Sequence, residues 1–170
     1  MKNHLYLIGY MGTGKTTVGR ILSENMCLPL LEMDEILISR FNMSINDVFE
    51  TLGEDVFREA ETLLLQDIAA LDGPSIVSCG GGVPLKEENR VILKESGKSI
   101  LLTASPSTLM SRLSDCKDRP LISDMEMSKI EEMLIKRKAA YDEAADYTIT
   151  TDGFFPSEIA GTIMDILANA

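Results

Sequence analysis

Residues 9–17, GYMGTGKTT, form a glycine-rich stretch whose residue types suit the binding of nucleotide phosphates. The pattern G-x-x-x-x-G-K-[ST] follows an apolar run, HLYLI, and precedes a helical one, which is the context of a phosphate-binding loop (P-loop). Its glycines let backbone N–H groups face a β-phosphate, Lys15 can reach the β- and γ-phosphates, and the Thr16 hydroxyl can ligate Mg²⁺. The candidate nucleotide-binding residues here are Gly12, Thr13, Gly14, Lys15, Thr16 and Thr17.

Two acids follow the second expected strand, in the segment Glu32-Met33-Asp34. The third and fourth strands end without an acid, so this segment is the expected source of a carboxylate for metal-bound water and for the acceptor. Alternation along an extended segment would place Glu32 and Asp34 on one side. Asp34 could instead cap the helix that begins there, and the spacing favours neither interpretation.

Three consecutive glycines, Gly80, Gly81 and Gly82, follow the third strand. One glycine is enough for a turn, whereas three in a row indicate that something approaches the backbone closely. Ligands of open α/β sheets bind at this edge, at the carboxyl ends of the strands. A plain tight turn is the alternative.

The formal net charge of −11 repels anionic substrates such as ATP. An anion site must therefore be built locally from a few arginines and backbone N–H groups, so the position of each arginine is informative. Arg58 shares a helix face with Glu61, a spacing that also suits an ordinary surface ion pair. Arg137 lies in a charged helical segment, where solvent exposure is the default. Arg119 lies in the polar stretch 115–125, which we expect to be a mobile lid whose arginine stabilises the transition state at a γ-phosphate. Phe49 and Phe57 could simply pack in the core.

Apolar strand-like runs alternate with helical patterns along the whole chain, without repeats or linkers. This alternation predicts one α/β domain over residues 1–170, with a five-stranded parallel sheet and helices on both faces. Helices about 34–61 and the lid are insertions that we expect to bind substrate. The strands are predicted near 4–8, 28–33, 75–79, 98–103 and 147–151, and the helices near 15–26, 34–41, 44–52, 54–71, 86–95, 105–114, 126–145 and 156–168.

The composition points to a cytoplasmic protein. No apolar run is long enough to span a bilayer, and a cleaved signal segment would remove the P-loop. Three scattered cysteines and one histidine suit neither a disulfide framework nor a zinc site. The acidic charge disfavours nucleic acid and anionic membranes as partners.

Taken together, these motifs resemble shikimate kinase. The resemblance runs from Ile8 to about Asp152, and it rests on the P-loop together with Asp34, Arg58, Gly80–Gly82, Arg119-Pro120-Leu121 and Arg137. It implies a three-layer P-loop fold like that of nucleoside monophosphate kinases. It also implies an enzyme that uses Mg²⁺ and ATP to phosphorylate the 3-hydroxyl of shikimate in aromatic amino-acid biosynthesis. We expect the enzyme to be a monomer.

The resemblance also implies a role for individual residues. Asp34 would contact the ring hydroxyls and help take the proton, while Arg58 and Arg137 would hold the carboxylate. Gly80, Gly81 and Gly82 would line the pocket with Met11, Phe49 and Phe57, and Glu61 would support Arg58. Arg112 would stack on adenine, Arg119 would belong to the lid, and Glu32 would replace the family's usual Asp near Mg²⁺.

Two other readings remain open at the level of the sequence. Another small-metabolite kinase, such as one acting on gluconate, would share the P-loop and lid but need not have the arginine pair. A nucleotide-binding regulator without turnover is disfavoured by Lys15, Asp34 and Arg119, and the guanine motif N-K-x-D of a GTPase is absent.

Overall fold

Five short strands form a single parallel sheet in the order β2-β3-β1-β4-β5, which confirms the predicted sheet. The computed structural model describes residues 4–114 and 127–169, so the proposed lid with Arg119 lies outside the described residues. The strands are β1 (His4–Ile8), β2 (Leu30–Glu32), β3 (Ile76–Ser78), β4 (Gly97–Thr103) and β5 (Tyr147–Thr150).

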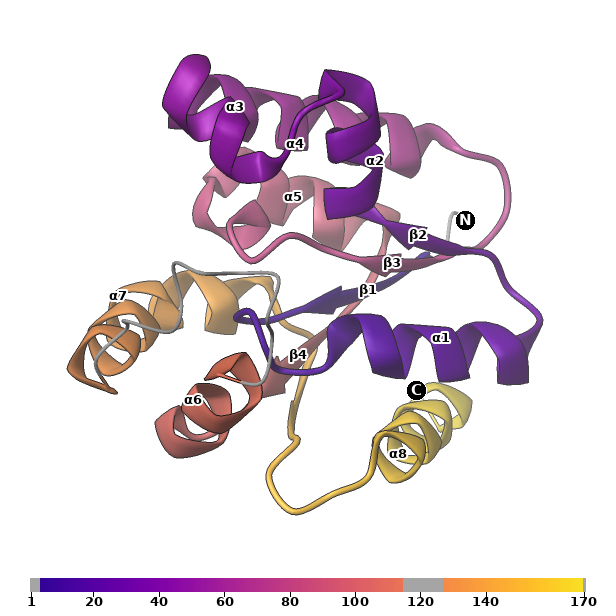
Figure 1. Cartoon of the computed structure of the whole chain (residues 1–170). Helices are drawn as coiled ribbons and strands as arrows, with labels where there is room; N and C mark the ends of the chain where they lie inside the picture. The colour runs from indigo at the N-terminus through magenta and orange to yellow at the C-terminus, as the bar shows by residue number, and fades with distance from the viewer. Residues whose placement is uncertain (1–3, 115–126, 170) are drawn as a thin grey trace.

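Helices cover both faces of this sheet (Figure 1). Helices α1 and α8 pack together on one face, while α4, α5 and α7 contribute to the core on the other. The helices are α1 (Lys15–Met26), α2 (Met33–Phe41), α3 (Ile45–Thr51), α4 (Glu54–Ala70), the short 3₁₀ helix η1 (Val83–Leu85), α5 (Glu87–Ser96), α6 (Pro106–Ser114), α7 (Met127–Ala144) and α8 (Pro156–Ala168). No described helix is long and apolar enough to cross a membrane.

The apolar sequence of β1 follows from its central place in the sheet. Leu5 and Leu7 face the core beside α1 and α8, whereas Tyr6 and Ile8 face the larger core on the opposite side. A strand buried on both faces needs apolar residues at successive positions, and this is why HLYLI shows no polar alternation. The strand thereby holds the following loop on a rigid support.

The strand register brings three segments to one edge of the sheet. Leu7 pairs with Ser78, and Ser78 pairs with Glu32 on its other side. The loop after β1, the start of α2 and the glycines after β3 therefore leave the sheet at the same level. Residues that are up to about seventy positions apart in sequence meet there.

The second strand is shorter than the sequence predicted, and the difference matters for the acids. Strand β2 covers only Leu30–Glu32, and Met33 already belongs to α2. Asp34 therefore lies in the first helical turn, so the argument from alternation along an extended segment was wrong. The capping alternative is also wrong, because the residue at the N-cap is Glu32.

Candidate active site

Side chains of the P-loop form hydrogen bonds to the carbonyl oxygens of the same loop. Gly14 adopts a left-handed conformation with φ 95°, and α1 begins at the next residue. The Lys15 ammonium donates hydrogen bonds to the carbonyl oxygens of Gly9 at 2.8 Å and Tyr10 at 3.0 Å. The Thr13 hydroxyl also donates to the Tyr10 oxygen, at 2.8 Å. The loop is thus closed into a ring at the start of a helix, which is a favourable place for an anion.

A hydroxyl and a carboxylate meet beside this loop. The Thr16 hydroxyl donates a hydrogen bond to Glu32 Oε2 at 3.1 Å. The other carboxylate oxygen, Oε1, is buried and has no hydrogen-bond partner among the described residues. A hard cation with water ligands needs oxygen donors of this kind, so the pair is compatible with Mg²⁺.

Arg112 connects α6 to the outer side of the P-loop. Its guanidinium donates to the Gly12 carbonyl oxygen at 3.1 Å and to the Thr151 hydroxyl at 2.9 Å. A third hydrogen bond reaches the Thr151 carbonyl oxygen at 3.2 Å. Arg112 therefore lies beside the P-loop, and Thr151, directly after β5, fixes its orientation. Its contact with adenine stays a prediction.

Arg58 lies in a cage of acids and aromatic rings. Its Nη1 donates to Glu61 at 2.5 Å, and its Nη2 contacts Glu54 at 3.0 Å. The guanidinium carbon lies 5.7 Å from the centre of the Phe49 ring and 5.6 Å from that of Phe57. Glu61 is only 1% exposed, so an ordinary surface ion pair was the wrong interpretation of this spacing.

Burial and ion pairing act against each other in this cage. Burial is the largest influence on Glu61 and raises the pKa of its carboxyl group, although Arg58 opposes it. Burial alone would lower the pKa of Arg58, but its ion pairs with Glu61 and Glu54 raise that pKa overall. The guanidinium therefore stays charged, and it is held in one orientation for an incoming anion.

The three glycines make room for side chains. A Cβ on Gly82 would lie 1.8 Å from Arg58 Nη1, and a Cβ on Gly80 would lie 2.6 Å from Glu61 Oε1 and 2.8 Å from Asp34 Oδ1. None of the three glycines has a positive φ, so backbone conformation does not require them. The segment does form a turn, closed by a hydrogen bond from Val83 N–H to the Gly80 carbonyl oxygen at 3.1 Å, and close approach of side chains is what requires glycine at positions 80 and 82.

Arg137 approaches the same glycines from α7. Its Nη1 donates to the Gly81 carbonyl oxygen at 3.4 Å, and the Tyr141 hydroxyl donates to that oxygen at 2.7 Å. The Arg137 guanidinium also lies over the Tyr10 ring, 5.4 Å from its centre. Arg137 is only partly exposed, so the solvated charge run was the wrong interpretation. Arg58 and Arg137 thus border neighbouring glycines.

A buried thiol marks the point where the two groups of residues meet. Cys79, at the end of β3, has a pKa raised far above its usual value, because it is fully buried. The charges that act on it include Lys15 from the P-loop, and Glu61 and Asp34 from the helices opposite. Geometry shows the same meeting point, because a Cβ on Gly81 would lie 3.7 Å from the Gly9 carbonyl oxygen of the P-loop and 3.6 Å from Arg137 Nη1.

Comparison with known proteins identifies the family. The family model for shikimate kinase matches residues 11–168. The chain belongs to the shikimate kinase family. A shikimate kinase of Enterococcus faecalis is 38% identical over 165 residues, which cover 96% of this chain and 97% of that protein. The solved shikimate kinase from Acinetobacter baumannii in complex with shikimate has a TM-score of 0.90 and 31% identity, over 98% of this chain and 93% of that one.

The fold itself is shared more widely than the family. A gluconokinase from Sinorhizobium meliloti matches with a TM-score of 0.62 and 19% identity, over 99% of this chain and 93% of that one. At this identity the likeness concerns the fold alone. The paired arginines, and not the sheet, must therefore carry any argument about the acceptor.

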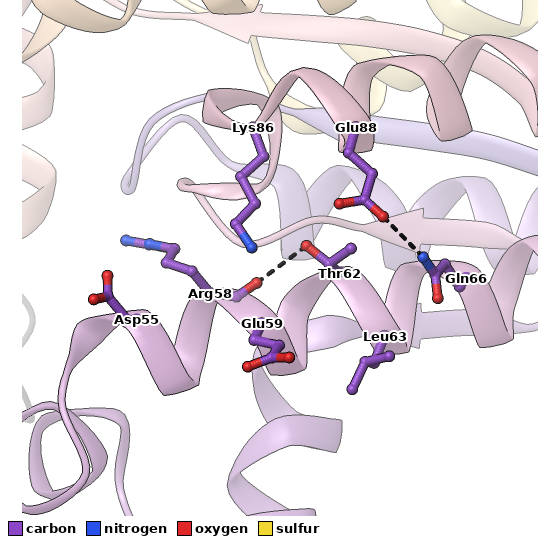
Figure 2. Close-up of a pocket in the computed structure, with 8 residues that line it drawn as sticks. All are labelled: Asp55, Arg58, Glu59, Thr62, Leu63, Gln66, Lys86 and Glu88. Carbon is purple, nitrogen blue, oxygen red and sulfur yellow. Dashed lines mark hydrogen bonds between the residues drawn. The ribbon is translucent and has the colours of Figure 1, made fainter.

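A surface hollow lies beside α4 and shares Arg58 with the site just described. Its volume is about 410 Å³, and Figure 2 shows it between α4 and the start of α5. The hydrogen bonds drawn there join Thr62 to the Arg58 backbone and Gln66 to Glu88. Arg58 is the only predicted site residue among those lining it: Asp55, Arg58, Glu59, Thr62, Leu63, Gln66, Lys86 and Glu88.

Sequence reasoning missed three residues that orient the arginines. The ring of Tyr10 lies against Arg137, Tyr141 donates to the same Gly81 oxygen as Arg137, and Thr151 holds Arg112. A signal existed for Tyr141, because it follows Arg137 by four positions and so lies on the same face of a helix. Tyr10 and Thr151 gave no such signal, since their contacts join segments far apart in sequence.

Proposed function

We propose that the chain transfers the γ-phosphate of ATP to the 3-hydroxyl of shikimate, giving shikimate 3-phosphate and ADP in the pathway to chorismate. The observation that carries this proposal is the pair Arg58 and Arg137, which border Gly82 and Gly81 beside the P-loop. Two guanidinium groups can grip a carboxylate through charge-assisted hydrogen bonds. Membership of the family supports the same acceptor.

The nucleotide side uses the closed P-loop. Backbone N–H groups of Gly12, Thr13 and Gly14 would face the phosphates, with Thr17 beside them on α1. The Lys15 ammonium, which rests on two loop carbonyl oxygens, would turn to the β- and γ-phosphates. Arg112 would lie against adenine, since it is already held beside the loop.

Mg²⁺ would be held by oxygen atoms next to this loop. The Thr16 hydroxyl would bind it directly, and the Glu32 carboxylate would bind its water ligands. The unpartnered Oε1 of Glu32 and the 3.1 Å contact between the two side chains support this assignment. When bound, Mg²⁺ neutralises phosphate charge during transfer.

The acceptor would lie over the three glycines. Arg58 and Arg137 would bind its carboxylate, and the rings of Phe49 and Phe57 would flank it with Met11. Glu61 fixes Arg58 through a buried 2.5 Å contact, which leaves the guanidinium rigid before the acceptor arrives. A hydroxyl at the far side of the ring would then face Asp34.

Asp34 would orient the attacking hydroxyl and accept its proton as the O–P bond forms. Its place in the first turn of α2 points its Oδ1 toward Gly80, within the space bounded by the glycines. Arg119, which lies outside the described residues, would close over the γ-phosphate and exclude water. Water exclusion matters here because hydrolysis competes with transfer to a small hydroxyl.

ATP turnover coupled to a detection enzyme tests the proposal. Purified protein should form ADP rapidly with shikimate and slowly without it. Gluconate, tested at the same concentration, should not raise the rate above the acceptor-free level. Turnover with gluconate alone, or a rate that no acceptor changes, would overturn the proposal.

The remaining parts of the proposal concern the setting of the enzyme. We propose that it acts as a monomer in the cytoplasm; one chain supplies the P-loop, Arg58 and Arg137. Size-exclusion chromatography with light scattering, at the concentration used for the assay, tests the oligomeric state.

A further inference from the structure

Tyr10 is buried although it lies at the tip of a ligand-binding loop. It is 1% exposed, and its hydroxyl donates a hydrogen bond to the Met133 sulfur at 3.3 Å. A P-loop binds phosphate through backbone groups and its Lys and Thr, so this aromatic ring has no role in phosphate binding itself. Its environment indicates another purpose.

The ring of Tyr10 meets one face of α7. Met133, Arg137 and Tyr141 are spaced by four residues and therefore lie along this face. The Arg137 guanidinium lies 5.4 Å from the Tyr10 ring centre, while its Nη1 donates to the Gly81 oxygen. One surface of the guanidinium is thus covered by an aromatic ring, and one edge is fixed by a carbonyl oxygen.

The backbone of Tyr10 is fixed equally well. Its carbonyl oxygen accepts hydrogen bonds from Lys15 at 3.0 Å and from the Thr13 hydroxyl at 2.8 Å. The ring therefore cannot move far unless the P-loop itself moves. A residue held in this way can serve as a rigid support for a flexible arginine.

The electrostatics agree with this arrangement. Burial raises the pKa of the Tyr10 phenol, so the ring stays neutral, and the positive charge of Arg137 opposes that rise. A neutral, electron-rich ring attracts a guanidinium without competing for its hydrogen bonds. The ring of Tyr10 thus covers a face of the guanidinium without taking up its N–H donors.

We propose that Tyr10 is a positioning residue that holds Arg137 in the orientation needed to bind the acceptor's carboxylate. The proposal rests on the function proposed above. It gives the P-loop a second role, which is to align Arg137, and with it the bound carboxylate of the acceptor, with the nucleotide phosphates. A misaligned guanidinium loses the fork geometry of its contact with a carboxylate.

The test compares Tyr10→Leu with Tyr10→Phe on two acceptors, shikimate and its uncharged methyl ester. Loss of the ring should raise KM for shikimate by about 2- to 30-fold, the range of cation–π contacts from exposed to desolvated sites. KM for the ester and the affinity for ATP should change little. Tyr10→Phe keeps the ring and should behave like wild type.

Tyr6→Leu is the matched control for damage to the core. Tyr6 is also fully buried, and its hydroxyl bonds to Ser96 at 2.7 Å, away from both arginines. Tyr6→Leu should lower the melting temperature but leave the preference for acid over ester unchanged. A merely structural role of Tyr10 would give the same pattern and would overturn the proposal.

A shape-conserving series covers the case in which Tyr10→Leu does not fold. Phenylalanine at position 10, with increasing fluorine substitution of the ring, weakens attraction to a cation while it preserves the aromatic shape. KM for shikimate should rise stepwise along this series, and KM for the ester should stay constant. A flat series for shikimate would overturn the proposal.

The two proposals fail in different ways. Equal use of acid and ester by wild type would remove the carboxylate clamp, and with it the proposed function. A strong preference in wild type that persists in Tyr10→Leu and along the fluorinated series would overturn only the role of Tyr10.

Discussion

The nucleotide side and the acceptor side of this site are built in opposite ways. The nucleotide side is one continuous loop, residues 9–17, whose contacts are mostly to its own backbone. The acceptor side is assembled from α2, α4, the glycines after β3, and α7, and it acts through charged side chains. In the proposed function, the first would bind phosphate through groups common to P-loops, whereas the second would have to recognise one small acid.

This difference shows where specificity lies in the molecule. The gluconokinase shares the fold of this chain with a TM-score of 0.62, although the two sequences are only 19% identical. A fold that is shared so widely can supply phosphate chemistry but not the choice of acceptor. Substitutions should therefore separate into those that affect turnover with every acceptor and those that affect shikimate alone.

Lys15→Met should have the largest effect, on the nucleotide side. Removing the ammonium removes a contact to charge that develops at the phosphates, so kcat should fall by several orders of magnitude. Circular dichroism should show an intact fold, because Lys15 lies in the P-loop at the surface of the site and not in the hydrophobic core. Near-normal turnover would contradict the P-loop assignment.

Asp34→Asn should have the next largest effect. Asp34 belongs to the acceptor side, but its loss should slow phosphate transfer from the nucleotide side. The change keeps the size of the side chain and removes its charge, so kcat should fall by about 10²- to 10⁴-fold if Asp34 takes the proton. ATP affinity should change only modestly. A large loss of ATP binding would instead place Asp34 with the metal.

Gly82→Ala should affect the acceptor side alone. The new Cβ would lie 1.8 Å from Arg58 Nη1, so the guanidinium must move, and KM for shikimate should rise by about 10- to 100-fold. Gly161→Ala is the control, because no atom lies within 4 Å of the added Cβ and α8 should gain about 0.5–1 kcal/mol. Equal KM values in the two variants would contradict the placement of Arg58.

Glu61→Gln should give the smallest effect, as a change in how stability depends on pH. Burial raises the pKa of folded Glu61 above its ordinary value of 4.5, so the folded state binds more protons than the unfolded state in that window. The stability of wild type relative to Glu61→Gln should therefore decrease as pH rises from about 4.5 through the raised pKa. Urea unfolding at several pH values measures this difference. A difference that grows with pH would mean that the ion pair with Arg58 outweighs burial.

The same contrast explains how much the sequence could predict. The P-loop is local, so residue types and spacing were enough to place Lys15 and Thr16. The five strands and their parallel arrangement also followed from alternating patterns, because burial on both faces leaves a clear apolar signature.

The acceptor side was harder to predict from spacing. The Arg58–Glu61 spacing suggested a surface pair, and only tertiary packing buries Glu61. The strand register places Asp34 near Gly80, which lies 46 positions away, and no local pattern encodes that meeting. Residue types alone offered an acid in the segment 32–34 for the acceptor, whereas the roles of Arg58 and Arg137 came from the resemblance to the family. The contact between Tyr10 and Arg137 emerged from the structure.

The most direct measurement is the affinity of wild type and Arg58→Lys for shikimate and for its methyl ester. Loss of a buried, bidentate arginine–carboxylate contact costs about 2–5 kcal/mol, which is about 30- to 5,000-fold in affinity. Lysine cannot reproduce the fork geometry, so the variant should lose most of the preference for the acid while it binds ATP normally. The account predicts a strong preference for the acid in wild type. Equal binding of acid and ester by wild type would contradict it.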